Sequence, residues 1–208
     1  MITFIIIILL SILIYFKSTF IKKHKTILYI GFTLLSIITL IIWQLTSKSI
    51  FNTLSLPWIK GFLGLAIFYL VMIAGALPNW KFKKKLYSVR TELSIIGFIA
   101  ITPHALYNLI KIYNGDIDPT YFGIIAYIIM IPLFMTSFIT IRKRMNHKDW
   151  KNLQRFAYIV YLLLFIHLII HFSIPINRVL YIILLINYLI FKVIKTFKYE
   201  KNKAMSQK

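Results

Sequence analysis

The chain of 208 residues contains no cysteine and only five acidic residues, against 25 lysines and arginines. The absence of cysteine excludes disulfides, iron–sulfur clusters, thiolate metal sites and a cysteine nucleophile. The few carboxylates do not form the pairs or triads on which hydrolases depend, and no glycine-rich phosphate-binding loop is present. If the protein performs redox chemistry, that chemistry must therefore come from a bound cofactor.

Apolar residues dominate the sequence. They make up 60% of the chain, and the mean hydropathy is +0.81, whereas soluble domains are about half apolar. Several apolar runs reach the roughly 18 residues that a helix needs to cross a bilayer. The net charge of +20 comes from cations in the gaps between these runs, where they orient the chain and attract anionic lipid headgroups. We therefore predict a protein embedded in the lipid bilayer, with no nucleic-acid partner.

Seven apolar segments are separated by short polar gaps, and each is expected to form a helix. They are residues 2–16, 26–45, 61–77, 93–113, 121–141, 156–172 and 179–197. The first is short for a membrane span. The predicted fold is all-α, a polytopic transmembrane helical bundle.

Basic and poorly charged gaps alternate along the chain. The gaps after the first, third and fifth segments and the tail after the seventh are rich in lysine and arginine, whereas the gap after the fourth carries Asp116 and Asp118. Basic loops tend to stay in the cytoplasm. The alternation therefore predicts a multi-pass protein of the cell membrane with its N-terminus outside and its C-terminus in the cytoplasm.

Three of the five histidines, His104, His167 and His171, lie inside apolar segments, whereas His24 and His147 lie in basic gaps and are expected to be solvated. Ionisable side chains inside a membrane are costly and usually mark functional sites. Measured from the cytoplasmic ends of their segments, His104 lies about 18 Å and His167 about 16 Å along its helix, at about 1.5 Å per residue. Two imidazoles at one height can bind a haem iron from both sides. The alternative is two separate residues that hydrogen-bond between helices.

Three residues near this pair are compatible with a haem site. Gly97 lies about two turns before His104 on the same helix face, where the lack of a side chain would let a porphyrin approach. Pro103 frees a backbone carbonyl one turn earlier, which could aim the imidazole. His171 lies one turn beyond His167 and could hydrogen-bond a haem propionate, replace His167 as the ligand, or have no role. The sequence places no third ligand for a zinc ion beside it.

From Arg90 onward, two stretches are similar to a known family. They are VRTELSIIGFIAITPHALYNL, with its spacing from arginine through glycine to histidine, and PLFMTSFITIRKRMNHKDWKNLQRFAYIVYLLLFIH. The second carries a proline, threonine and serine, a basic turn, a tryptophan and a final histidine. Both resemble the ferric-reductase-like transmembrane family and, within it, the MsrQ subfamily of haem-binding membrane subunits of methionine sulfoxide reductase systems. The resemblance covers about residues 61–195.

The resemblance implies a domain organisation and a ligand set. A six-helix haem-binding bundle would occupy residues 26–197, after an additional N-terminal helix and basic loop in residues 1–25 and before a basic cytoplasmic tail in residues 198–208. His104 and His167 would be the axial ligands of a haem b on the outward side. Where the family has histidine in a Leu-His-Arg motif, this chain has Gln154, which puts a second, inner haem in doubt.

A basic group at the expected inner face is a candidate site for an anionic cofactor such as FMN. It consists of Arg142, Arg144, Lys151 and Arg155. Positive-inside topology explains these cations equally well. In MsrQ-like proteins, quinol or a cytosolic flavin reductase supplies electrons, and an extracytoplasmic reductase subunit receives them.

The predicted function is therefore haem-dependent electron transfer by an oxidoreductase subunit. Electrons would pass from quinol or a cytosolic flavin donor to an outward-facing acceptor, either a reductase subunit or ferric iron. One alternative is a cofactor-free helical membrane transporter or assembly protein, although the sequence shows no inverted repeat and only Pro103 and Pro132 interrupt the spans. Another is a relative that has lost its electron supply, as Gln154 would indicate.

Overall fold

The computed structural model describes residues 2–45, 50–171 and 175–206, and all regular secondary structure in these ranges is helical. The helices are α1 (Ile2–Lys23), α2 (Lys25–Leu45), α3 (Ile50–Ile59), α4 (Phe62–Ala74), α5 (Lys81–Ser88), α6 (Arg90–Tyr113), α7 (Tyr121–Met135), α8 (Ile139–Arg142), α9 (His147–His171) and α10 (Pro175–Ser206). The predicted all-α fold is confirmed.

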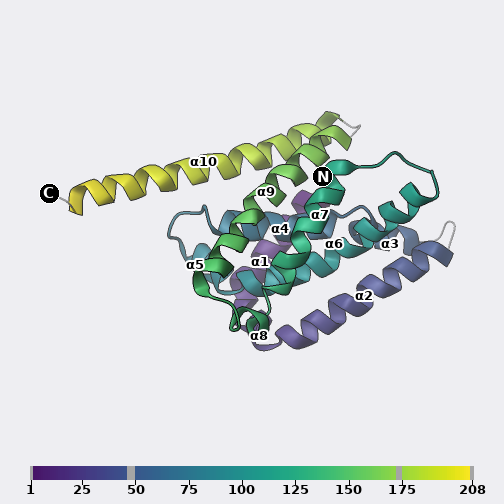
Figure 1. Ribbon diagram of the computed structural model, residues 1–208, viewed down its shortest axis with the longest axis horizontal. Coiled ribbons are helices and arrows are strands. Elements are labelled where there is room, and N and C mark those ends of the chain that lie inside the picture. The colour runs from purple at the N-terminus through teal and green to yellow at the C-terminus, as the bar shows by residue number, and fades with distance from the viewer. Residues whose placement is uncertain (1, 46–49, 172–174, 207–208) are drawn as a thin grey trace.

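Helix α4 lies at the centre of the bundle. Its sequence, FLGLAIFYLVMIA, is apolar on every side, which is typical of a helix surrounded by others. All of its residues except Phe62 and Leu65 are buried. Helices α1 and α6 pack closely against it, α7 packs along α9, and α2 packs along α6. In Figure 1, α2 follows the lower edge of the bundle and α10 the upper edge, with the C-terminal part of α10 extending beyond the other helices.

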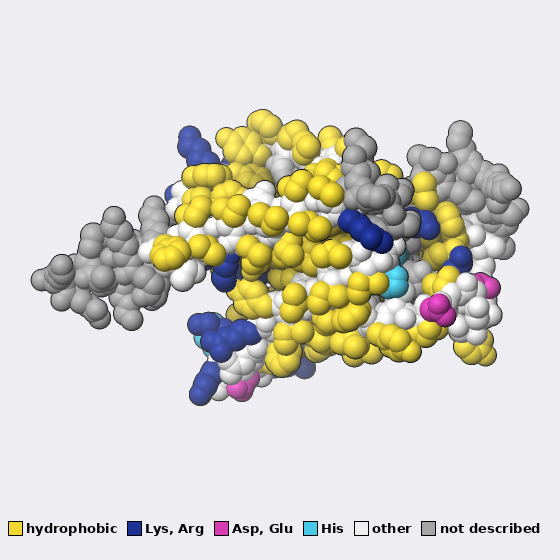
Figure 2. Space-filling model, turned by 90° about the horizontal axis from the view of Figure 1, so that it is seen from above, with side chains coloured by type: hydrophobic (Ala, Val, Ile, Leu, Met, Phe, Trp, Pro, Cys, Tyr) yellow, Lys and Arg dark blue, Asp and Glu magenta, His cyan; other side chains and the backbone are white. Residues whose placement is uncertain are grey.

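Five helices are long and apolar enough to cross a membrane: α1, α2, α6, α9 and the Arg178–Phe197 part of α10. Helices α4 and α7 are shorter apolar helices. Figure 2 shows apolar side chains over most of the described surface, with a group of lysine and arginine side chains at the lower left. So much exposed apolar surface is stable only in contact with lipid. Each predicted apolar segment overlaps one of these helices, and the protein is a multi-pass membrane protein.

The first helix is longer than its apolar segment. We expected residues 2–16, but α1 continues to Lys23 and has 22 residues, enough to cross a bilayer. A kink at Lys17 interrupts it, and Lys85 of α5 donates a hydrogen bond of 2.7 Å to the neighbouring Tyr15 carbonyl. Near the start of α1, the hydroxyl group of Thr3 forms a hydrogen bond of 3.0 Å with the hydroxyl group of Tyr181 in α10. Helix α1 is thus attached to the bundle near its start and just before its kink.

The fifth segment is divided, whereas we expected one helix over residues 121–141. Helix α7 ends at Met135, and the short α8 begins at Ile139. The hydroxyl groups of Thr136 and Ser137 donate to the carbonyls of Pro132 and Leu133, each at 2.7 Å. These bonds satisfy carbonyls at the helix C-terminus, so the chain turns instead of continuing.

Two helices lie in stretches that were expected to be gaps. Helix α3 precedes α4, and α5 lies in the basic gap after it. Helix α5, KFKKKLYS, buries Leu86 while Lys81 and Lys84 are exposed, the pattern of a helix at a membrane surface. Helix α10 also extends beyond its apolar segment to residue 206, so most of the predicted tail, residues 198–208, is helical.

Pro103 in α6 leads to a hydrogen bond between two helices. Because proline lacks an N–H, the Ile99 carbonyl one turn earlier in α6 has no partner within the helix. The Ser36 hydroxyl of α2 donates to this carbonyl at 3.1 Å. We expected the freed carbonyl to help aim the His104 ring, but it contacts α2 instead.

Candidate functional site

His104 of α6 and His167 of α9 lie side by side. Their ring centroids are 6.5 Å apart, and the ring planes are inclined by 67°. The equal heights that we expected from helix geometry are therefore realised, and the bundle brings the two predicted ligands together. Iron binding by this pair stays a prediction.

The backbone orients the His104 ring. Its Nδ1 lies 2.8 Å from the carbonyl oxygen of Ile59, at the end of α3. A carbonyl can only accept a hydrogen bond, so Nδ1 carries the proton and Nε2 keeps a lone pair. The Asn108 side-chain nitrogen donates to the His104 carbonyl at 3.0 Å and lies 3.2 Å from both ring nitrogens. Because the Asn108 nitrogen is equally far from both ring nitrogens, it is not aligned with the lone pair of either.

Gly61 allows the start of α4 to approach this ring. It is the N-cap of α4, with a φ of 73° in the left-handed region that favours glycine. A Cβ atom at this position would lie 3.1 Å from Cγ and Cδ2 of His104 and 3.0 Å from Cδ1 of Ile101. Sequence reasoning missed this residue because a glycine ahead of an apolar run is a common helix boundary. Its contact with His104 exists only in the folded chain.

His167 is packed against a second glycine. A Cβ atom on Gly123 of α7 would lie 3.1 Å from Cε1 and 3.2 Å from Nδ1 of His167. This Nδ1 is buried and has no hydrogen-bond partner among the residues that the structure describes. A buried polar atom without a partner is costly, and a ligand or a bound water would remove that cost. Sequence reasoning also missed Gly123, since nothing local distinguishes it from other glycines in helices.

The other predicted site residues lie in different surroundings. The His171 ring is 4.7 Å from the His167 ring, and the side chain is exposed. Gly97 faces α4, where its Cβ would lie 3.0 Å from Cγ2 of Ile67, so the space it leaves is occupied by a neighbouring helix. Arg155 is exposed on α9. The structure therefore brings His171 to the histidine pair but not Gly97 or Arg155.

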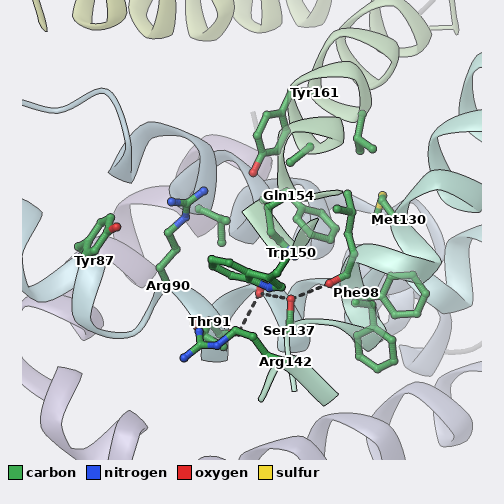
Figure 3. A pocket seen from close by; sticks show the side chains of 17 residues that line it. Tyr87, Arg90, Thr91, Phe98, Met130, Ser137, Arg142, Trp150, Gln154 and Tyr161 are labelled. Atoms are coloured by element: carbon green, nitrogen blue, oxygen red, sulfur yellow. Dashed lines mark hydrogen bonds between the residues drawn. The ribbon is translucent and has the colours of Figure 1, made fainter. Parts of the chain in front are cut away.

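A cavity of about 270 Å³ lies at the end of the bundle where α6 and α9 begin, here called the basic end. Arg90 and Arg142 border it together with Trp150, Gln154 and Tyr161 (Figure 3). Arg90 lies about 20 Å before His104 along α6, at about 1.5 Å per residue. The cavity and the histidine pair therefore occupy different levels of the same bundle.

Residues 60–165 match the family described as the ferric reductase like transmembrane component, which is about half of the chain. The chain belongs to this family. The match includes His104 and ends two residues before His167.

One curated relative of this ferric-reductase-like chain is an uncharacterized protein of Treponema pallidum (strain Nichols), which is 30% identical over 162 residues. The alignment covers 71% of this chain and 45% of the relative, so the chain spans less than half of that protein's length. No solved structure matches the chain.

In this ferric-reductase-like protein, Gln154 joins two helices. Its Nε2 donates to the Thr136 hydroxyl at 3.2 Å, and Trp150 Nε1 donates to the Thr136 carbonyl at the same distance. Both bonds attach α9 to the C-terminus of α7. No histidine is among the described residues that line the cavity.

The histidine pair, in contrast, is compatible with iron. Metal–imidazole bonds are about 2 Å long, and each imidazole nitrogen lies about 1 Å from its ring centre, so two imidazoles on opposite sides of one metal ion have centroids about 6 Å apart. The observed 6.5 Å is close to this value. On His104 the proton is held at Nδ1, and on His167 the buried Nδ1 has no hydrogen-bond partner among the described residues. Each ring therefore has a nitrogen whose lone pair is not used in a backbone hydrogen bond.

Proposed function

We propose that this ferric-reductase-like protein is a haem b electron-transfer protein with His104 and His167 as its axial ligands. The observation that carries the proposal is the 6.5 Å separation of two imidazoles contributed by two helices of a membrane bundle. When bound, haem supplies one-electron chemistry through the ferric and ferrous states of its iron.

The side chains and backbone around the pair prepare it for this role. The Ile59 carbonyl holds the proton of His104 on Nδ1, the arrangement that sets ring orientation in many metal sites. The close approach at Gly61 and Gly123 holds the two rings in place. Both rings are half-buried in the bundle, and burial contributes to setting the potential of a bound haem.

The direction of transfer follows from the distribution of charge. We propose that the basic end faces the cytoplasm, with the N-terminus outside, because basic gaps remain on that side. Electrons would arrive from a cytosolic flavin donor or quinol and leave on the side of His171, which is exposed next to His167. The acceptor would be an extracytoplasmic reductase subunit, as in the MsrQ subfamily, or ferric iron.

The proposal is tested with protein purified from cells that have a full haem supply. Haem per chain is measured as the pyridine haemochrome, and reduced-minus-oxidised spectra are recorded. We expect one haem b per chain, and its loss or a changed spectrum in His104→Ala and His167→Ala, because each removes one iron ligand. His147→Ala is the matched control, since His147 is exposed at the start of α9. A colourless protein would contradict the proposal and favour a cofactor-free function.

A further inference from the structure

A second hollow, here called the lateral groove, lies along α6 between α2 and the C-terminal end of α7. It has a volume of about 510 Å³ and is lined by residues of α2 and α6 together with Phe134 and Phe138. Helix α2 packs along α6, whereas α7 packs chiefly along α9, so α6 forms the floor of the groove. Ile30 and Leu34 of α2 line it and are exposed, so the groove opens toward lipid. Its volume is within the range of about 300–1,000 Å³ that is usual for small-molecule sites.

The wall of the lateral groove is mainly apolar, and its threonine and serine hydroxyl groups are already used. Thr33, Ser36 and Thr102 line it, and each donates a hydrogen bond to a backbone carbonyl, at 2.8, 3.1 and 2.8 Å. A polar ligand that enters an apolar site must replace the hydrogen bonds it loses, and these hydroxyl protons are not available to it. A hydrocarbon chain has no such requirement, so the groove favours one.

The length of the lateral groove corresponds to one leaflet of a bilayer. Tyr29 and Leu40 of α2 both line it, and at about 1.5 Å per residue they lie roughly 16 Å apart along the helix. The hydrocarbon core of a bilayer is about 30 Å thick, so one leaflet contributes about 15 Å. A single acyl chain that follows α2 would therefore fill the groove from the membrane surface to the middle of the bilayer.

The end of the groove at Tyr29 lies among exposed cations. The Tyr29 ring is 6.2 Å from the ring of Phe138, and α8 lies beside the start of α2 (Figure 1). Lys25 is the first residue of α2, Lys143 follows α8, and both are exposed. Glu92 is close enough to Tyr29 to interact with it electrostatically, but it is buried, so the exposed charges of Lys25 and Lys143 are positive. Lysines at a membrane surface attract the phosphate groups of anionic lipids.

We propose that the lateral groove binds an anionic phospholipid, with one acyl chain lying between Thr33 and Thr102 and the headgroup phosphate near Lys25 and Lys143. The apolar wall and the length of one leaflet select the chain, and the two lysines select a headgroup with net negative charge. A zwitterionic lipid has the same chains but no net charge, so it gains less from the lysines. This site does not depend on the proposed electron transfer.

Binding is measured by native mass spectrometry of the detergent-purified protein, titrated with dipalmitoyl phosphatidylglycerol or dipalmitoyl phosphatidylcholine. The two lipids have the same chains, and we expect the anionic one to bind at least about tenfold more tightly. Leu34→Trp should lose the bound lipid, because its indole would occupy the groove. Leu35→Trp is the matched control, since Leu35 is the next residue of α2 and is exposed like Leu34 but does not line the groove.

The headgroup contact is tested by combining Lys25→Gln with Lys143→Gln. Each loss of charge should weaken phosphatidylglycerol binding by about fivefold, while phosphatidylcholine binding stays unchanged. Lys84→Gln is the control, because Lys84 is exposed on α5, which packs against α1, α4 and α6. Equal losses in the Lys84→Gln variant and in the double variant would overturn the role of the two lysines.

Three further results would overturn the inference. They are equal affinities for the two lipids, equal lipid binding by the Leu34→Trp and Leu35→Trp variants, and a dimer that Leu34→Trp converts to a monomer while lipid binding is retained, which would assign the groove to a second copy of the chain. Haem content is measured on the same samples. A protein that holds haem but binds neither lipid refutes only this inference, whereas a colourless protein that binds phosphatidylglycerol refutes only the proposed function.

Discussion

At the scale of single residues, the histidine site depends on two glycines, whose lack of a side chain leaves room for the two imidazole rings. The rings of His104 and His167 each lie where a neighbouring helix comes unusually close, and the close residue is glycine in both cases, Gly61 and Gly123. Even one methyl group at these positions would compete with an imidazole for space. Packed interiors transmit such small changes in volume to their neighbours.

Gly123→Ala is expected to disturb the site without unfolding the helix. The new Cβ would lie 3.1 Å from Cε1 of His167, so the ring must shift away from its position opposite His104. We expect lower haem content or an altered reduced spectrum, measured on the purified protein. Alanine is the better helix former by about 1 kcal/mol, so a loss of haem would come from the displaced ring.

Gly31→Ala is the matched control for this substitution. Gly31 is also helical, in α2, and a Cβ there would have nothing within 4 Å. This variant should keep its full haem content and unfold at the same or a slightly higher temperature. Identical haem contents in both variants and the unchanged protein would show that the Gly123 contact does not constrain His167.

At the scale of elements, hydrogen bonds between helices satisfy carbonyls where a proline or a helix end interrupts the bonds within a helix. Ser36 of α2 satisfies the carbonyl that Pro103 frees in α6, and Gln154 and Trp150 of α9 bind Thr136 where α7 ends. An unsatisfied carbonyl inside a membrane protein is costly. Each interruption therefore creates a position at which a neighbouring helix is attached.

Ser36→Ala is expected to destabilise the protein by about 1 kcal/mol, because the Ile99 carbonyl loses its donor. The measurement is thermal unfolding in detergent. The effect should disappear in a Pro103→Ala background, where an alanine N–H can bond the Ile99 carbonyl within the helix, so the two substitutions form a double-mutant cycle. Thr33→Ala serves as the comparison, since the Thr33 hydroxyl bonds only the Tyr29 carbonyl in its own helix. Additive effects of Ser36→Ala and Pro103→Ala would argue against this link.

At the scale of the whole molecule, charge distribution and apolar surface together define how the bundle lies in a membrane. Large apolar side chains are exposed on α1, α2, α6, α7, α9 and α10, where lipid would cover them. The buried core consists mainly of α4 and the surfaces that contact it. The histidine pair and the basic cavity lie at different levels of this bundle.

The proposed orientation can be tested cleanly because the chain has no cysteine of its own. Asp118→Cys lies in the exposed turn between α6 and α7, and Lys143→Cys lies in the exposed turn after α8. A membrane-impermeant maleimide should label the Asp118→Cys variant in intact cells and the Lys143→Cys variant only after lysis. The opposite pattern would reverse the orientation, and with it the proposed direction of electron transfer.

The positions of the membrane helices were largely predictable because they depend on local sequence. A run of apolar residues must form a helix in lipid, where every backbone polar group needs an internal partner. All seven segments therefore contain helices, but the boundaries differ where side chains compete for the backbone, as Thr136 and Ser137 do after α7. The pairing of His104 with His167 was also predictable, since height along a helix follows from residue count alone.

The sequence by itself determined that this protein is a membrane helical bundle with histidines at matching heights, because hydropathy, charge and helical rise are local properties. Only the tertiary structure decided what faces each ring. It showed that Ile59 fixes the His104 proton, that Gly123 contacts His167, that Gly97 faces α4 rather than the pair, and that Arg90 shares a cavity with Arg142. These contacts depend on how each helix is rotated about its axis, which is set by packing against neighbours that are distant in the chain.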